Sequence, residues 1–151
     1  MPTKTPAARL IPAFIFAATF VAFLPSLSNY FVNWDDPSNL LKNPHYRGLG
    51  LTQIRWMLTT FHMAHYQPVS WMTLGLDYLI WGMNPFGYHL TNLLLHGFNA
   101  VLFYFLALRL TGFEQIKIDI PTLGGAAFAA LFFSLHPLRV ESVAWATERR
   151  D

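Results

Sequence analysis

The feature that most constrains the fold of this chain is an apolar run from Leu10 to Phe31 without a charged residue. As a helix, the run would rise about 33 Å, and the hydrocarbon core of a bilayer is about 30 Å thick. The run is therefore predicted to cross a membrane. Two adjacent carboxylates, Asp35 and Asp36, follow it almost directly. Acidic groups at a membrane exit suggest chemistry at the interface.

Composition supports a membrane protein. Apolar residues make up 54% of the chain and charged residues 12%, about half of what soluble domains carry. Two further runs, Tyr78–Leu108 and Ile120–Leu138, lack Asp, Glu, Lys and Arg, and the second needs help from Val140–Ala146 to span a bilayer. The prediction is an all-α integral membrane protein with three transmembrane helices, at about 10–31, 89–109 and 121–136. With no cysteine, the chain has neither a disulfide nor a thiolate site.

A cleavable signal peptide is the alternative for the first run, because Lys4 and Arg9 precede it as an n-region would. The apolar stretch exceeds the roughly 7 to 15 residues of an h-region, and no Ala-x-Ala site follows it. An uncleaved anchor is therefore preferred.

Basic residues set the expected orientation. Lys4 and Arg9 precede the first span, and Arg109 and Lys117 flank or lie in a link at about 110–120. By the positive-inside rule, the amino terminus and this link are cytoplasmic. The segment at about 33–88 and the stretch from His136 onward then share the opposite side. Because the basic residues mostly flank predicted spans, the expected partner is the lipid bilayer, and no nucleic acid is expected.

The outer segment is too aromatic for an ordinary solvated loop and is predicted to lie on the membrane surface as short interfacial helices. Thr52 is predicted to cap a helix in which Ile54 and Met57 recur at helical spacing. Ser70 is predicted to cap a second helix over 72–79.

The second span carries a polar stripe at offsets of 0, 3, 7 and 10 residues, on one helical face. Polar groups in hydrocarbon cost several kcal/mol unless satisfied, so this face should avoid lipid. Interhelical hydrogen bonds and a substrate-lining role, weighted toward the outer residues, both remain open. The stripe consists of His89, Asn92, His96 and Asn99.

A metal site is the next hypothesis. His62 and His65 are three residues apart, and His45, Asp35 and Asp36 lie in the same outer segment. A His-x-x-His pair without its partner motif is more often an interfacial pair than a ligand set. No metal or other cofactor is predicted, and a divalent metal stays an open alternative.

Charge returns after the third apolar run, from His136 onward. Arg139, Arg149 and Arg150 there could bind a phosphate or pyrophosphate through bidentate hydrogen bonds. The alternative is a charged membrane flank with Glu and Arg paired a few residues apart, as for Glu148.

Several longer motifs together resemble the transmembrane and tetratricopeptide-repeat-containing O-mannosyltransferase family and its bacterial relatives. The resemblance covers nearly the whole chain and implies the start of a GT-C glycosyltransferase fold, in the bacterial inner membrane rather than the endoplasmic reticulum. The motifs are Asn33-Trp34-Asp35-Asp36-Pro37, Trp71 to Asp77, Asn84-Pro85, His89-Leu90-Thr91-Asn92-Leu93-Leu94-Leu95-His96, His136-Pro137, Val140-Glu141-Ser142-Val143-Ala144-Trp145 and Glu148-Arg149.

The resemblance implies an inverting transfer of a sugar from a polyprenyl-phosphate donor to a hydroxyl of an acceptor protein or glycan, on the periplasmic or luminal side. It implies a catalytic base in the first outer loop, matching Asp35 or Asp36, with Asp35 favoured. The expected donor-phosphate ligands are Arg139, Arg149, Arg150 and His136. The expected lining of the substrate cavity is His89, Asn92 and Glu141.

The chain departs from the family in length, since such enzymes have about ten or more spans. It is therefore expected to be an amino-terminal fragment, inactive alone, whose reading frame continues into further spans. A different class of function stays open: a small non-catalytic membrane protein that binds a lipid carrier or partner helices through the His89 to Asn99 stripe. A transporter fragment is a third reading.

Overall fold

The computed structural model describes residues 6–111 and 119–150. Within these residues every regular element is a helix, which confirms the all-α prediction, and the only extended pairing is an isolated bridge between His62 and His65. The chain divides into two compact units. One unit takes in the residues up to Leu24 and Leu93–Val140, and the other takes in Pro25–Asn92 and the residues from Glu141 onward.

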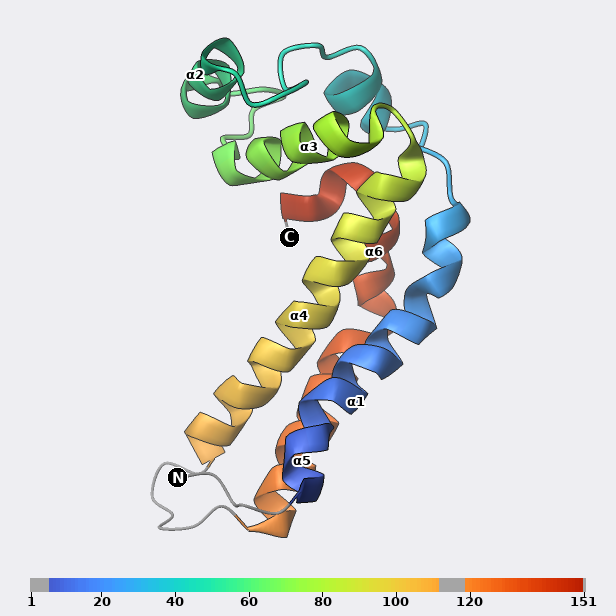
Figure 1. The fold of residues 1–151 in the computed structure, drawn as a ribbon, viewed down its shortest axis with the longest axis vertical. Helices are drawn as coiled ribbons and strands as arrows, with labels where there is room; N and C mark the ends of the chain where they lie inside the picture. Colours follow the sequence, from blue (N-terminus) through green and yellow to red (C-terminus); the bar gives the residue numbers. More distant parts are fainter. Residues whose placement is uncertain (1–5, 112–118, 151) are drawn as a thin grey trace. The chain divides into compact units, whose positions relative to one another are not determined.

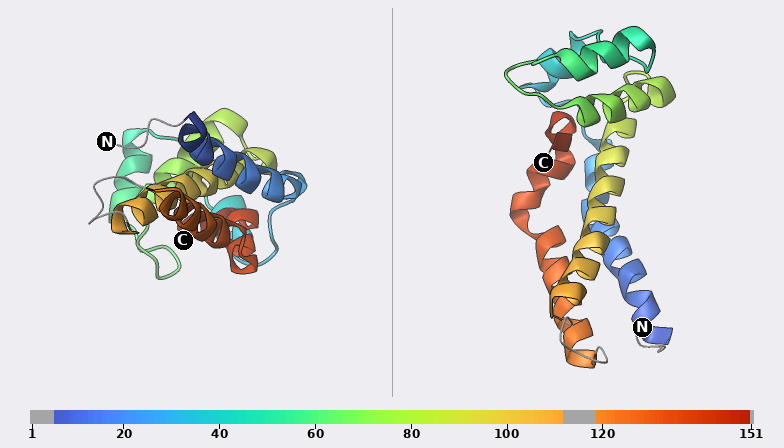
Figure 2. Two further views of the ribbon diagram at one scale, coloured as in Figure 1. Left: turned by 90° about the horizontal axis from the view of Figure 1, so that it is seen from below. Right: turned by 90° about the vertical axis from the view of Figure 1, so that its left-hand side faces the viewer.

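The first unit is a helical bundle built from α1 (Pro6–Phe23), the later turns of α4 (Pro85–Thr111) and α5 (Ile120–Leu135). Figures 1 and 2 show these helices running alongside one another. A Cβ at Gly97 would come within 2.8 Å of the Phe16 ring, so α1 and α4 pack closely because that position has no side chain. The buried core of this bundle consists of Ile15, Ala100, Tyr104, Ala126 and Ala130.

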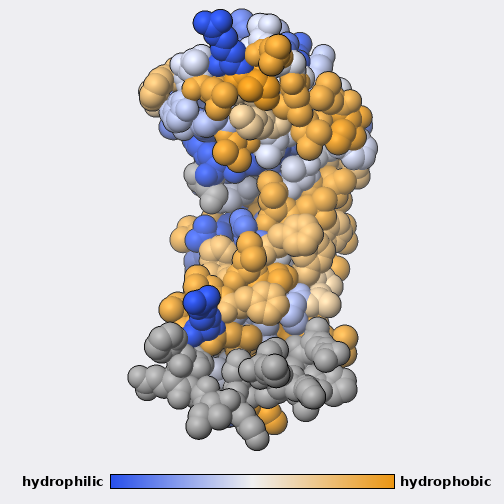
Figure 3. Space-filling model, turned by 60° about the vertical axis from the view of Figure 1, so that its left-hand side comes forward, coloured by the Kyte–Doolittle hydropathy of each residue, from blue (hydrophilic) through white to orange (hydrophobic). Residues whose placement is uncertain are grey.

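In the part of the chain that the structure describes, two helical segments, Leu10–Ser28 and Pro85–Thr111, are long and apolar enough to cross a membrane. The third predicted span is α5 followed by Pro137–Ala144, bent by 54° at the break, and it counts as a span only if both pieces are taken together. On the face drawn in Figure 3, hydrophobic side chains cover much of the surface. Large exposed apolar residues of α4 and α5 include Phe98, Leu102, Phe105, Phe128 and Phe132.

At prolines, the helix boundaries in the structure differ from those predicted from the apolar runs. The first helix was expected to run to Phe31 but α1 ends at Phe23 and continues as a 3₁₀ helix, η1 (Leu24–Ser28). Pro25 has no N–H and disfavours the α conformation of the residue before it. In α4, Pro85 occupies the first helical position, where its missing N–H costs nothing, so this helix begins four residues before His89.

The second unit is built from α2 (Leu51–Thr59), α3 (Pro68–Trp81), the first turns of α4, α6 (Val140–Ala144) and η4 (Ala146–Arg150). A Cβ at Gly75 would lie 2.8 Å from the carbonyl oxygens of Tyr46 and Gly48, so the backbone of α3 closely approaches the backbone of the loop before α2. The buried core of the second unit consists of Leu40, Tyr46, Met57, Trp71, Leu74, Tyr88 and Ala146.

The two short helices predicted between the first and second spans are present as α2 and α3, but the predicted caps are wrong. Thr52 lies inside α2, whose N-cap is Gly50, and Ser70 lies inside α3, whose N-cap is Gln67. Pro68 begins α3 early because its fixed φ suits the first turn. The predicted link at about 110–120 falls largely outside the described residues, as do Lys4 and Lys117.

Candidate functional site

The two adjacent carboxylates occupy different environments just before a short π-helical turn, η2 (Pro37–Leu41). Asp36 is fully buried. One of its carboxylate oxygens accepts a hydrogen bond from the Val32 N–H at 2.7 Å, and the other accepts from the Thr147 N–H at 3.2 Å and the Thr147 Oγ1 at 2.8 Å. The Asp36 carboxylate is thus occupied in holding the loop to the segment that contains Thr147.

Asp35 is only partly buried. Within residues 6–111 and 119–150, no hydrogen bond or ion pair engages its carboxylate. Its backbone carbonyl accepts from the N–H groups of Ser38 and Asn39, at 3.1 and 2.9 Å, which fixes the backbone at this position. A carboxylate on a fixed backbone with free lone pairs is suited to accept a proton from a bound hydroxyl.

Arg149 is held in a buried network. Its Nη2 pairs with the Asp77 carboxylate at 2.5 Å and donates to the Tyr88 carbonyl at 3.0 Å, while its Nε donates to the Asn92 Oδ1 at 2.7 Å. The Arg149 and Asp77 side chains are 2% and 3% exposed. Asp77 also accepts from the Thr91 hydroxyl at 2.6 Å. The guanidinium therefore joins α3, the start of α4 and η4.

Burial dominates the electrostatics of this pair. Desolvation raises the pKa of the Asp77 carboxyl, and the neighbouring Arg149 and the Thr91 hydroxyl oppose that rise. Desolvation likewise lowers the pKa of the Arg149 guanidinium, and Asp77 opposes that fall. Each partner is thus needed to keep the other charged, because a lone charge in this place would be strongly disfavoured.

Two residues of the polar stripe on α4 form hydrogen bonds with other segments of the chain. In the second unit, the Asn92 amide donates to the Trp145 carbonyl at 3.0 Å. In the first unit, a ring nitrogen of His96 lies 2.9 Å from the Ser134 carbonyl, and the Ser134 hydroxyl accepts from Thr19. His89, Asn92 and His96 are buried, whereas Asn99 is exposed.

His89 differs from the other members of the stripe. It is fully buried, and its ring nitrogens lie near the Tyr30 backbone without forming a well-directed hydrogen bond. The hydrogen bonds of Asn92 and His96 match the interhelical reading of the stripe, and they leave few free polar groups for a docking face.

Arg139 and His136 line a cavity of about 520 Å³ in the first unit. The Arg139 guanidinium lies 4.7 Å from the centre of the Phe133 ring, and no carboxylate among the described residues pairs with it. The His136 Nδ1 accepts from the Leu138 N–H at 3.3 Å, which in the neutral ring leaves the hydrogen on Nε2. The remaining lining is apolar: Phe103, Phe128, Ala129, Phe132, Phe133 and Leu138.

The other predicted phosphate ligands and the cavity residue Glu141 have different places. Arg149 is buried in its pair with Asp77, and Arg150 pairs with Glu148 at 2.6 Å in the second unit. Glu141 is exposed at the start of α6. The structure thus groups His136 with Arg139 and places both remaining arginines beside carboxylates.

The histidines of the metal hypothesis are mostly accounted for by aromatic packing. His45 stacks on Trp56 with ring centres 5.5 Å apart, and His62 lies edge-on to Trp56 and Trp71. Among the described residues, no group of three or more His, Cys, Asp or Glu side chains is arranged to hold a metal ion.

Sequence reasoning missed Thr147 and the role of Asp77. Nothing in the sequence marks Thr147 as the partner of a carboxylate far away in the chain. Asp77 did carry a signal, since it is the one charged residue in the otherwise apolar α3 and a lone carboxylate on such a helix needs a partner.

No protein-family model matches the sequence, and no solved structure matches it. Curated proteins do. The chain is 29% identical to protein O-mannosyl-transferase Tmtc1 of Drosophila melanogaster over 143 residues, 89% of this chain and 16% of that protein. It is 29% identical to protein O-mannosyl-transferase TMTC1 of Mus musculus over 99% of this chain and 16% of that protein. Over 57% of the chain, it is 36% identical to protein O-mannosyl-transferase TMTC2 of Homo sapiens.

The chain thus spans about 16% of the length of the first two of these proteins. The similarity to both runs through the carboxylate pair, the polar stripe of α4 and most or all of the stretch between them, because it covers 89% and 99% of this chain. Together with the two apolar helices, it marks a membrane protein. By sequence, this chain is related to the transmembrane and tetratricopeptide-repeat-containing O-mannosyltransferases.

Proposed function

We propose that this chain forms part of a membrane glycosyltransferase that moves a sugar from a polyprenyl-phosphate donor to a hydroxyl group of an acceptor protein or glycan. The similarity to proteins named protein O-mannosyl-transferases supports the reaction class. The single observation that carries the site is the contrast between Asp36, whose two carboxylate oxygens both accept hydrogen bonds, and Asp35, whose carboxylate has no hydrogen bond or ion pair with the described residues.

Asp35 acts as the general base in this proposal. It takes the proton of the acceptor hydroxyl while the hydroxyl oxygen attacks the anomeric carbon. The bond from that carbon to the phosphate oxygen breaks, and the polyprenyl phosphate leaves with the electron pair, so the configuration inverts. A positioned base of this kind contributes about 10² to 10⁴ in rate.

Asp36 acts as a positioning residue in the same proposal. Its three hydrogen bonds to Val32 and Thr147 fix the loop in which Asp35 lies. Arg149 fixes the segment that contains Thr147, through Asp77 and Asn92. The base is therefore held by a buried frame rather than by a mobile loop, which favours a defined proton-transfer geometry.

The first unit would hold the phosphate of the donor. Arg139 and the Nε2–H of His136 are hydrogen-bond donors beside a cavity of aromatic side chains, which suits an anionic head joined to an isoprenoid tail. Arg149 and Arg150 are paired with carboxylates, so the phosphate is assigned to Arg139 and His136. The membrane would be a bacterial inner membrane, with the amino terminus cytoplasmic and the transfer on the opposite side.

The test is a transfer assay on membranes that contain the complete product of the reading frame encoding this chain. Labelled sugar is offered as a polyprenyl-phosphate conjugate or as a nucleotide sugar. Transfer from the lipid donor alone, with Arg139→Gln raising the KM for that donor about tenfold, supports the proposal. Arg109→Gln is the matched control, because Arg109 is exposed and lies outside the cavity. Transfer from the nucleotide sugar alone would refute it.

A further inference from the structure

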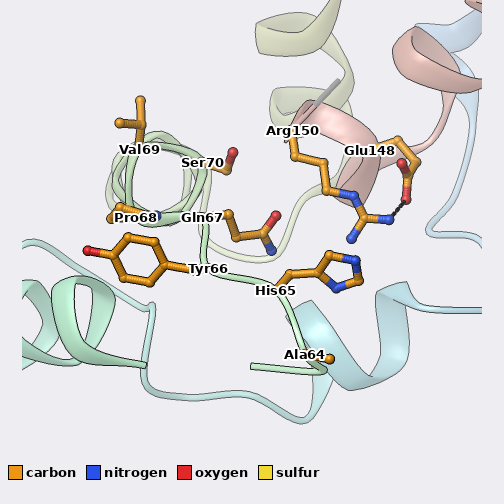
Figure 4. Close-up of a pocket in the computed structure, with 9 residues that line it drawn as sticks. All are labelled: Ala64, His65, Tyr66, Gln67, Pro68, Val69, Ser70, Glu148 and Arg150. Carbon is orange, nitrogen blue, oxygen red and sulfur yellow. Dashed lines mark hydrogen bonds and ion pairs between the residues drawn. The ribbon is translucent and has the colours of Figure 1, made fainter. Parts of the chain in front are cut away.

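A second cavity, of about 740 Å³, lies in the second unit and is separate from the cavity lined by His136 and Arg139. It is formed where the loop before α3 faces η4, and its volume falls within the range of about 300 to 1,000 Å³ found for small-molecule sites. Figure 4 shows the His65 and Gln67 side chains extending toward the guanidinium of Arg150. Polar groups thus converge on this space from two segments that are distant in the sequence.

The charges in this cavity are balanced. Arg150 Nη2 lies 2.6 Å from Glu148 Oε1, and both residues line the cavity. A bound anion would compete with the Glu148 carboxylate for the guanidinium and would be repelled by it. Guanidinium has five N–H donors, so Arg150 keeps donors for an uncharged ligand while it holds Glu148. The cavity therefore favours a neutral polar ligand over a phosphate.

One polar atom in this wall lacks a partner. The Gln67 Oε1 is buried and accepts no hydrogen bond from the described residues. A buried acceptor without a donor costs free energy, and a ligand hydroxyl that donates to it would remove that cost. Ser70, which also lines the cavity, adds a hydroxyl that both donates and accepts.

We propose that this cavity binds a neutral hexose through Gln67, Ser70 and the Glu148–Arg150 pair. A pyranose offers several hydroxyl groups, each a donor and an acceptor, and so matches a wall that mixes both. The neutral polyol follows from the cavity, and the choice of a hexose among polyols rests on the proposed function. A metal ion is a poorer match, since Glu148 and His65 alone do not supply three ligands.

The experiment is saturation-transfer NMR with methyl α-mannopyranoside on the full chain in lipid nanodiscs, which avoids sugar-based detergents. The parent chain should transfer saturation to the sugar, and Gln67→Ala should weaken binding about tenfold. The Gln67 side chain makes no capping hydrogen bond in α3, so this change leaves the helix start intact. Gln53→Ala on α2, outside the cavity, is the matched control and should bind like the parent.

Ser70→Ala is the second variant, since the Ser70 side chain makes no hydrogen bond with the described residues, and it should also weaken binding. Absence of saturation transfer to the sugar would overturn the proposal, and so would equal binding by the parent and both variants. Displacement of the sugar by millimolar inorganic phosphate would overturn the assignment of a neutral ligand. Because the sample contains neither lipid donor nor acceptor, this result is independent of whether the protein transfers sugar.

Discussion

The Asp36 carboxylate and Thr147, 111 residues apart in the sequence, are joined by two hydrogen bonds to one oxygen, from the Thr147 N–H at 3.2 Å and the Thr147 Oγ1 at 2.8 Å. This link joins two distant segments of the second unit and holds the backbone beside Asp35, the residue before Asp36, in place. The two adjacent carboxylates therefore have different surroundings. Asp36 is engaged within the second unit, and the Asp35 carboxylate has no hydrogen bond or ion pair with the described residues.

Thr147→Val should therefore destabilise the protein. Valine keeps the backbone N–H and nearly the same shape but removes the hydroxyl that donates to Asp36. We expect the free energy of unfolding to fall by about 1 to 3 kcal/mol, because a buried carboxylate loses a donor. Thermal unfolding followed by tryptophan fluorescence measures this. Ser142→Ala, which removes a hydroxyl without a hydrogen bond to the described residues, should leave the midpoint unchanged. Equal midpoints for Thr147→Val and the parent would contradict the role given to this link.

Arg149→Met should be among the most harmful single changes in the second unit. It would leave the Asp77 carboxylate buried without its cation, at a cost of about 3 to 5 kcal/mol. The double variant Asp77→Leu with Arg149→Met should lose much less than the sum of the single changes, since both charges are then gone. A double-mutant cycle on unfolding midpoints gives this coupling. Additive losses would show that the pair does not act as a unit.

Gly75→Ala should destabilise the contact of α3 with the loop before α2. Its new Cβ would meet the carbonyl oxygens of Tyr46 and Gly48 at 2.8 Å, and forcing the backbones apart costs about 1 to 3 kcal/mol. Gly124→Ala in α5 is the matched control. A Cβ there meets none of the described atoms within 4 Å, so the helix should gain up to about 1 kcal/mol. Circular dichroism during heating tests both, and a stabilised Gly75→Ala protein would refute the close approach.

Ser134→Ala should weaken the first unit slightly. The Ser134 hydroxyl accepts from the Thr19 hydroxyl at 2.9 Å and so links α1 to α5. Hydrogen bonds between helices within membranes contribute on average about 0.6 kcal/mol and at most about 1.7. The unfolding midpoint should therefore drop by a small amount, and a loss well above that range would mean that Ser134 carries more than this bond.

The apolar runs predicted where long helices form, because the cost of exposing the backbone to lipid leaves a helix as the only local solution. They could not predict the ends. Pro25, which has no N–H for an α-helical hydrogen bond, lies where α1 changes to the 3₁₀ helix η1. Pro137 ends α5, since the residue before a proline avoids the α conformation. His136 accordingly adopts an extended backbone, with φ of −63° and ψ of 136°. At these two boundaries a proline, and no change in hydropathy, marks where the α-helix stops, whereas Pro12 lies inside α1 without ending it.

The candidate site was predictable only in part. The sequence singled out both carboxylates and the cations from His136 onward but could not tell which of them are paired. Asp36 and Arg149 are buried by contacts with residues far away in the chain, and such contacts leave no periodic pattern. The His65 to Ser70 side of the second cavity was not found either, because its chemistry depends on Glu148 and Arg150 reaching it.

The most direct test of Asp35 as the general base is the initial rate of sugar transfer by the complete protein with Asp35→Asn, measured beside its thermal midpoint. We expect a rate lower by about 10² to 10⁴ at an unchanged midpoint, because the base is lost while the fold is kept. Asp36→Asn should instead lower the midpoint, since an amide nitrogen would face the Val32 N–H or the two Thr147 donors. Transfer at the parental rate by a folded Asp35→Asn protein would contradict the proposed role of Asp35 as the general base.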